Sequence, residues 1–145
     1  AQGQGVLVGV PMYLLDANIF LEVLLGGARA AECLRLFSLL QEGRLSAVVS
    51  KFAVYSVCLI LFRKKQPGLA RDFLAYLDSL SALQIHGTSL EEDAEAFASA
   101  EKFGLDFDDG LQFTVAQRLG MEAIVSFDRD FDKVPIERLE PSALV

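Results

Sequence analysis

Short apolar runs alternate with amphipathic helical patterns along the chain, and this alternation constrains the fold more than any other feature. The runs MYLLD, RLSAVVS, ALQIHG and AIVSFD have the length and composition of buried strands, and IERLEP offers a fifth. Strands that alternate with helices form parallel sheets covered on both faces. The order therefore predicts an α/β fold with a mainly parallel sheet of four or five strands in a single domain, residues 12–145. Residues 1–11 are expected to be a leader segment or residues added ahead of that domain.

Two of the expected helices carry details that a structure can test. Thr88 and Ser89 each stand three residues before a glutamate, Glu91 and Glu92, which is the capping-box spacing at a helix start. The side chains expected to face inward from that helix are Leu90, Ala94, Phe97 and Ala98. Residues 52–62, FAVYSVCLILF, are apolar nearly all round, so this second helix is expected to be covered on most sides.

The composition indicates which partner and which cellular location to expect. The mean hydropathy of +0.37 is high and indicates that apolar surface is buried against another chain, so a homodimer is expected. The longest apolar stretch, GVLVGVPMYLLDANIFLEVLLGG, is interrupted by a proline and polar residues, so no membrane span is expected. Cys33 and Cys58 lie in apolar helical patterns, where a small buried thiol is expected. A reducing, cytoplasmic location follows.

The charged and histidine residues exclude several kinds of site. With the single histidine, His86, a Cys/His zinc site is excluded and a Ser-His-Asp triad is not expected. A net charge of -7 argues against a protein that coats nucleic acid by neutralising phosphates. Local basic surface is still available at RKK, residues 63–65, with Arg71 a little further on. A solvated helix end is the alternative interpretation of this basic cluster.

Three aspartates stand where α/β proteins build their sites. Asp16 directly follows YLL, Asp128 follows AIVSF, and Asp109, within LDFDDG, begins the helix that leads to the AIVSF strand. Sites in open parallel sheets form outside the carboxyl ends of the strands, beside the point where strand order reverses. The three carboxylates therefore converge if the first and fourth strands are neighbours. The alternative is local: Asp16 and Asp109 as helix N-caps, and Asp128 as the start of a turn.

The segments LLDANIFLEVLL and LDFDDGLQFTVAQRLGMEAIVSFDRDF, with the element order between them, resemble a PIN domain over nearly the whole chain. The resemblance implies a three-layer α/β/α sandwich. It also implies an endoribonuclease that depends on Mg²⁺ or Mn²⁺ and cleaves single-stranded RNA, often as the toxin of a VapBC-type toxin–antitoxin pair. It places Asp16, Asp109 and Asp128 at metal-binding positions, Ser126 at a hydroxyl position that orients a carboxylate or a water, and Asn18 at a polar position.

One position departs from the pattern of the family. Members usually have a glutamate on the helix after the second strand, and counting along this helix places Ser56 there. Mg²⁺ is a hard ion that prefers carboxylates and water, and a hydroxyl lacks the charge that a second metal site requires. Weakened activity is therefore expected. Asp106 or Asp108 could compensate, although Asp108 is expected to be a helix N-cap, and Asp130 and Asp132 are expected to face solvent.

The sequence is also compatible in part with other functions. The first is a catalytically inactive PIN fold that acts through dimerisation or through partner or RNA binding, with residues 52–62 as its contact surface. A phosphoaccepting receiver domain has paired acids after its first strand and a lysine after its last, whereas LLDAN has one acid and RLEP has no lysine. A haloacid-dehalogenase-like phosphatase has Asp-x-Asp where this chain has Asp16-Ala17-Asn18.

Overall fold

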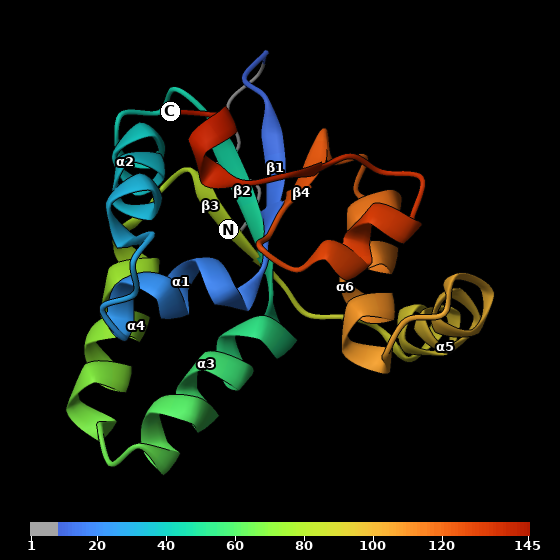
Figure 1. Ribbon diagram of the computed structural model, residues 1–145, viewed down its shortest axis with the longest axis horizontal. Helices are drawn as coiled ribbons and strands as arrows, with labels where there is room; N and C mark the ends of the chain where they lie inside the picture. Colours follow the sequence, from blue (N-terminus) through green and yellow to red (C-terminus); the bar gives the residue numbers. More distant parts are fainter. Residues whose placement is uncertain (1–8) are drawn as a thin grey trace.

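The computed structural model describes residues 9–145, and at its centre is a five-stranded sheet whose strands all run parallel (Figure 1). The strands are β1 (Met12–Leu15), β2 (Ser46–Ser50), β3 (Leu83–His86), β4 (Ala123–Val125) and β5 (Arg138–Leu139). The helices are α1 (Ala17–Leu24), α2 (Ala30–Gln41), α3 (Lys51–Arg63), α4 (Pro67–Ser79), α5 (Leu90–Phe103) and α6 (Phe107–Arg118), with 3-10 helices η2 (Arg129–Lys133) and η3 (Pro141–Ala143). The predicted α/β fold is confirmed, and the fifth strand is present.

Strand β1 lies in the middle of the sheet, and strand order reverses beside it. The order across the sheet is β3-β2-β1-β4-β5, so the chain adds β2 and β3 on one side of β1 and then crosses to add β4 and β5 on the other. Leu14 of β1 pairs with Val48 of β2 and with Ile124 of β4. The carboxyl ends of β1 and β4 therefore meet at the reversal point, where α/β proteins place their sites.

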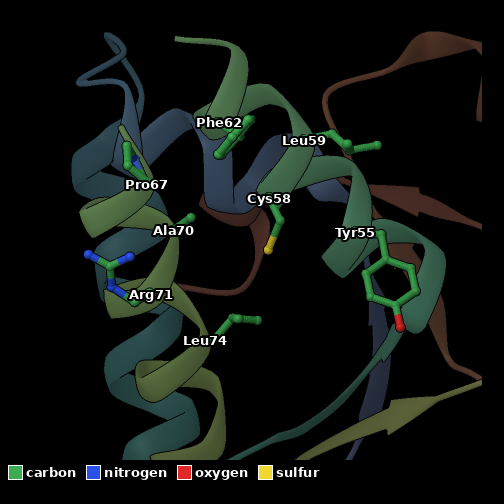
Figure 2. A pocket seen from close by; sticks show the side chains of 8 residues that line it. All are labelled: Tyr55, Cys58, Leu59, Phe62, Pro67, Ala70, Arg71 and Leu74. Carbon is green, nitrogen blue, oxygen red and sulfur yellow. The ribbon is translucent and has the colours of Figure 1, made fainter. Parts of the chain in front are cut away.

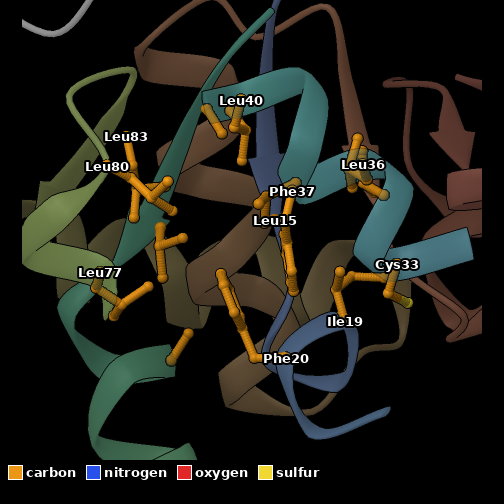
Figure 3. Packing of buried hydrophobic residues seen from close by; sticks show 14 of the residues in the cluster. Leu15, Ile19, Phe20, Cys33, Leu36, Phe37, Leu40, Leu77, Leu80 and Leu83 are labelled. Carbon is orange, nitrogen blue, oxygen red and sulfur yellow. The ribbon is translucent and has the colours of Figure 1, made fainter. Parts of the chain in front are cut away.

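Helices cover both faces of the sheet, which confirms the three-layer α/β/α architecture. Helices α1 to α4 pack on one face, around Leu15 (Figures 1 and 3). There Phe20 of α1 stacks on Phe37 of α2 with ring centroids 5.2 Å apart and meets Phe73 of α4 edge-on at 5.4 Å. Helix α6 packs on the opposite face, where Phe113 belongs to a second buried cluster. The two cores hold the sheet rigidly between them, and only its edges and strand ends reach solvent.

Helix α5 packs against α6 through small side chains. Ala96 and Ala100 of α5 are buried at this contact, and a Cβ atom added to Gly110 of α6 would lie 2.5 Å from the backbone oxygen of Ala96. The two helices approach this closely because Gly110 has no side chain. Leu90 is 86% exposed, and Phe97 is 59% exposed although its ring lies 4.4 Å from that of Phe107 on α6. The prediction that Leu90, Ala94, Phe97 and Ala98 face inward is therefore wrong.

One side of helix α3 is uncovered. Its inner residues, including Val54 and Val57, are buried in the core, whereas Phe52 is 40% and Phe62 67% exposed. The prediction that residues 52–62 are covered on most sides is wrong for the chain alone. Cys58 is half-buried in a groove between α3 and α4 (Figure 2).

Two further predictions concern the start of the chain and the membrane. The predicted leader, residues 1–11, lies almost wholly outside the described residues, and the extent of the domain, residues 12–145, stays a prediction. Within residues 9–145, no helix combines the length and the apolar character that crossing a bilayer requires.

Candidate active site

A hydrogen-bond network joins the ends of β1 and β4. Ser126 follows β4, is fully buried, and donates from its Oγ to Asp16 Oδ2 at 2.7 Å. The same Oγ accepts from the side-chain amide of Asn18 at 3.2 Å and from the backbone N–H of Asp128 at 2.9 Å. Asn18 in turn accepts from the backbone N–H of Phe127 at 3.4 Å. The loop that carries Asp128 is thereby fixed against the first turn of α1.

Asp16 is the N-cap of α1 and also a member of this network. Its Oδ1 accepts from the backbone N–H of Ala17 at 2.8 Å and from the side chain of Gln112 at 3.2 Å. Asp16 can therefore cap α1 and contact the residues at the end of β4 at the same time. Burial raises the pKa of Asp16, hydrogen bonds from Ser126, Gln112 and Ala17 lower it in part, and the nearby charge of Asp128 raises it again.

Helix α6 directs Asp109 toward the same edge of the sheet. The N-cap of α6 is Asp106, which makes no side-chain capping hydrogen bond, and Asp108 and Asp109 lie in the first helical turn. The prediction that Asp108 is the N-cap is therefore wrong, as is the N-cap alternative for Asp109. Asp109 is only 7% exposed. The helix N-terminus favours negative charge at this position, although burial opposes it.

Two overlapping groups of carboxylates centre on Asp109. Oxygens from Asp109, Asp128 and Asp130 lie within 4.8 Å of one another, and so do oxygens from Asp106, Asp108 and Asp109. Asp130 belongs to the first group, yet its side chain is 48% exposed and pairs with Lys133, so the prediction that it faces solvent is only partly right. A tight turn after β4 places Asp130 in this group. In the turn, the backbone N–H of Asp130 donates to Asp128 Oδ1 at 2.9 Å.

Asp132 is exposed as predicted, and it accepts a hydrogen bond from Arg138 Nε at 2.8 Å. It points away from the carboxylate groups, so the acids of the DRDFD turn divide between a site-facing pair and a surface ion pair.

A cavity of about 250 Å³ holds the three predicted aspartates together. Its polar lining consists of Asp16, Asn18, Asp108, Asp109, Gln112 and Asp128. Helix α3 forms the facing wall with Phe52, Ala53, Ser56 and Ile60. Ser56 lies where the family pattern places a glutamate, and its hydroxyl donates to the backbone oxygen of Phe52 at 2.9 Å. The wall that faces the aspartates thus contributes no charge.

The carboxylates of this cavity repel one another. Burial, followed by the charges of Asp108, Asp128, Asp16 and Asp130, raises the pKa of Asp109 from 3.8 to about 7. Burial and neighbouring carboxylates both disfavour the ionised form of such acids, and a bound cation would favour it. The arrangement can therefore bind a divalent ion that keeps all of these carboxylates ionised near neutral pH.

Gln112 is a site residue that the sequence did not reveal. It is buried on α6 one turn after Asp109, and its Nε2 holds Asp16, while its Oε1 is buried with no hydrogen-bond partner in the described part of the chain. A glutamine inside an apolar helical pattern is the only signal that could have identified it. Carboxylate oxygens together with one free amide oxygen are a donor set that fits Mg²⁺ or Mn²⁺.

The other predicted features lie away from the cavity. His86 Nε2 lies 3.0 Å from Glu92 Oε2. The carboxylate of Glu92 also forms the capping box of α5 with Ser89. His86 is absent from the cavity lining, so its pairing with Glu92 is structural. The basic cluster, residues 63–65, lies at the carboxyl end of α3, two helical turns beyond Ser56.

Comparison with known proteins identifies the fold family. The PIN domain family model matches residues 13–137, which is most of the chain. The chain belongs to the PIN domain family. The aspartates of this PIN domain come from the β1 end, the first turn of α6 and the β4 end, as the resemblance in the sequence implied. No curated protein matches the chain.

Solved structures share the fold of this PIN domain at low sequence identity. Mycobacterium tuberculosis VapC20, a toxin that cleaves the sarcin–ricin loop, is 16% identical with a TM-score of 0.70, over 86% of this chain and 95% of its own. A toxin–antitoxin complex from Klebsiella pneumoniae is 20% identical with a TM-score of 0.65, over 89% of this chain and 97% of the matched chain. FitAcB from Neisseria gonorrhoeae is 18% identical with a TM-score of 0.67, over 90% of this chain and 99% of its own.

Proposed function

We propose that this PIN domain is an endoribonuclease that depends on Mg²⁺ or Mn²⁺ and hydrolyses single-stranded RNA. The observation that carries the proposal is the single cavity in which Asp16, Asp109 and Asp128 converge from segments far apart in the chain, with the pKa values of Asp16 and Asp109 both raised. Carboxylates held together against their repulsion require a function to account for them.

Each residue of the site has a role in this proposal. Asp109 and Asp128 hold the divalent ion, and Asp16 joins them directly or through water. Ser126 positions Asp16 through its 2.7 Å hydrogen bond and the Asp128 backbone through its 2.9 Å bond. A bound ion would activate water and neutralise the charge that develops on a phosphodiester during in-line displacement.

The proposal extends to partners. Neighbouring structures are toxins and toxin–antitoxin complexes, which supports a role as the toxin of such a pair with a protein antitoxin as partner. The exposed apolar side of α3 supports a homodimer. A cytoplasmic location accords with free thiols at Cys33 and Cys58 and with an RNA substrate.

The direct test combines metal binding with cleavage. Titration calorimetry with Mn²⁺ and a fluorescent single-stranded RNA assay should both give signals for the wild-type protein, and EDTA should abolish cleavage. Asp109→Asn should weaken Mn²⁺ binding by roughly tenfold or more and remove cleavage. Asp78→Asn, on the exposed face of α4, is the matched control and should change neither. Cleavage that survives both Asp16→Asn and Asp109→Asn would overturn the assignment.

A second candidate is a catalytically inactive PIN fold that binds RNA or a partner. The observation that favours it is Ser56, a hydroxyl bonded to its own helix where the family pattern has a carboxylate. The variant Ser56→Glu separates the two candidates. If the parent is inert and Ser56→Glu cleaves RNA only with a divalent ion, the binding module is supported. If the parent already cleaves RNA, that candidate fails.

A further inference from the structure

The cavity lacks a group that an RNA-cleaving site needs. Among its lining residues, all within the described part of the chain, there are four aspartates and no lysine or arginine. The chain as a whole carries a net charge of -7. RNA phosphates approaching such a site are repelled unless a cationic side chain is supplied at its rim. A cationic side chain from elsewhere has to reach the rim of this cavity.

Helix α3 presents two parallel stripes of side chains. The first, Phe52, Tyr55, Leu59 and Phe62, follows a three-four-three spacing and is exposed, with Tyr55 57% and Leu59 54% accessible. This is the spacing with which one helix packs along another. The second stripe is displaced by one residue: Ala53, Ser56 and Ile60 face the cavity, and Arg63 continues it beyond the cavity. The apolar and the cavity-facing stripes therefore lie side by side along one helix.

The apolar stripe is self-complementary about its centre. Suppose that two copies of α3 pack antiparallel around a two-fold axis at the height of Val57 along the helix. Phe52 of one copy then faces Phe62 of the other, and Tyr55 faces Leu59. A hollow of about 520 Å³ lies beside Phe52 and is lined by the aromatic residues Phe52, Tyr55, Phe97 and Phe107. The partner's Phe62, exposed in the isolated chain, has the right chemistry and the right position to fill it.

The two-fold axis also decides where the basic cluster falls. It keeps the same flank of both helices on one side of the pair, so the second stripes of the two copies lie on a common face. The end of one α3 then lies beside the start of the other. The partner's Arg63 comes level with Lys51, one residue before Phe52 at the rim of the acidic cavity. The arginine of the same subunit is about 10 Å further along its own helix from Ser56.

We propose that two copies of this chain pair through α3 and that the partner's Arg63 completes each acidic cavity as the phosphate-binding cation. This rests on the proposed function, because it assigns the group that holds the RNA backbone beside the carboxylates. The guanidinium provides paired N–H donors that match phosphate oxygens. Each cavity is then incomplete in a single chain.

A crosslinking experiment tests the pairing without reference to activity. In a Cys58→Ser background, Phe52→Cys and Phe62→Cys proteins are prepared separately, mixed and oxidised. The mixture should form covalent dimers, because residues 52 and 62 face each other across the axis. Either protein alone should not, because its two thiols lie about 15 Å apart along the helices. Equal crosslinking by the single proteins, or a monomeric wild-type protein in sedimentation, would overturn the pairing.

A mixing experiment tests the role of Arg63. Asp109→Asn and Arg63→Ala should each reduce RNA cleavage by roughly tenfold or more, since one lacks a carboxylate and the other lacks the cation. In an equal mixture, about a quarter of the cavities regain both groups, because half of the dimers are mixed and each of these has one complete cavity. Recovered cleavage supports the proposal, and no recovery indicates that Arg63 acts on its own subunit or not at all. Arg35→Ala, exposed on α2, is the charge-matched control and should behave as wild type.

Failure of the proposed function gives a different pattern. If wild-type protein cleaves no RNA with Mn²⁺, nuclease activity is wrong, and the crosslinking result still decides the pairing. Binding of a fluorescent single-stranded RNA, followed by anisotropy in the presence of Mn²⁺, then decides the role of Arg63. Adding Arg63→Ala to Asp109→Asn should raise the dissociation constant roughly tenfold, whereas adding Arg35→Ala should not. Equal effects of the two substitutions would overturn the proposal.

Discussion

Neutralising Asp109 should stabilise the metal-free protein at alkaline pH. Asn has nearly the same shape as Asp and carries no charge. In the fold, burial and the charges of four neighbouring aspartates raise the pKa of Asp109 from 3.8 to about 7. Above that pH the folded protein has to hold an ionised carboxylate where its neighbours oppose it. Asp109→Asn removes this cost while leaving the packing of α6 unchanged.

The size of the effect follows from proton linkage. A pKa that rises from 3.8 to about 7 corresponds to about 4 kcal/mol of lost stability once the folded carboxyl ionises. The cavity is open to water at its mouth, so screening reduces this figure, and we expect about 2 to 4 kcal/mol at pH 8. For a domain of this size that is a rise of roughly 4 to 15 °C in Tm.

The pH dependence has a definite sign. Below about pH 4, Asp109 is protonated in both the folded and the unfolded chain, and the variant should match the wild type. Between pH 4 and 7 the unfolded chain releases the Asp109 proton while the folded chain retains it, so wild-type stability falls relative to the variant as pH rises. Above pH 7 the difference levels off. Urea unfolding at pH 4.5, 6 and 8 in EDTA measures this profile.

Two results would refute the reasoning. One is a variant less stable than wild type at pH 8, and the other is a difference that does not change with pH. Asp78→Asn, exposed on α4, is the control and should stay within about 0.5 kcal/mol at every pH. Saturating Mn²⁺ at pH 8 should stabilise the wild type and leave Asp109→Asn nearly unchanged, which closes the gap between them.

Three further substitutions test other parts of the structure by urea unfolding. Ser126→Ala removes the hydroxyl that bonds Asp16 at 2.7 Å and should cost about 1 to 3 kcal/mol; an unchanged midpoint would show that the network contributes nothing to stability. Gly110→Ala places a Cβ 2.5 Å from the oxygen of Ala96, forces α5 away from α6, and should cost about 1 to 3 kcal/mol; a stabilised variant would contradict this close approach. Leu90→Ser should stay within about 0.5 kcal/mol because Leu90 is 86% exposed, and a loss of several kcal/mol would mean that it faces inward.

The residues at strand ends could be predicted from sequence because topology alone places them. Asp16 and Asp128 directly follow apolar runs, and parallel strands bring such residues to one edge of the sheet whatever the side chains around them. Gln112 could not be predicted, since its role depends on which face of α6 turns toward Asp16. Asp130 could not be predicted either, because a tight 3-10 turn rather than a strand brings it close to Asp109 and Asp128.

The helices show where periodicity misleads. The pattern on α5 places large apolar residues at helical spacing, which normally marks a buried face. The true contact uses Ala96 and Ala100, because Gly110 on α6 permits a closer approach than any bulky side chain would. Which of two faces is buried thus depends on a glycine in a different helix. On α3 the same pattern marked a face that the isolated chain leaves in water.

The central position of β1 affects how the chain acquires its acidic cavity during synthesis. The hydrogen bond from Ser126 to Asp16 joins residues 110 positions apart. At translation rates of 5–20 residues per second, roughly 5 to 20 s pass between the appearance of Asp16 and that of Ser126. When β1, β2 and β3 have all been synthesised, Asp109 and Asp128 have not, so these carboxylates cannot yet converge with Asp16. A nascent chain therefore cannot assemble this group of carboxylates until residue 128 has been synthesised.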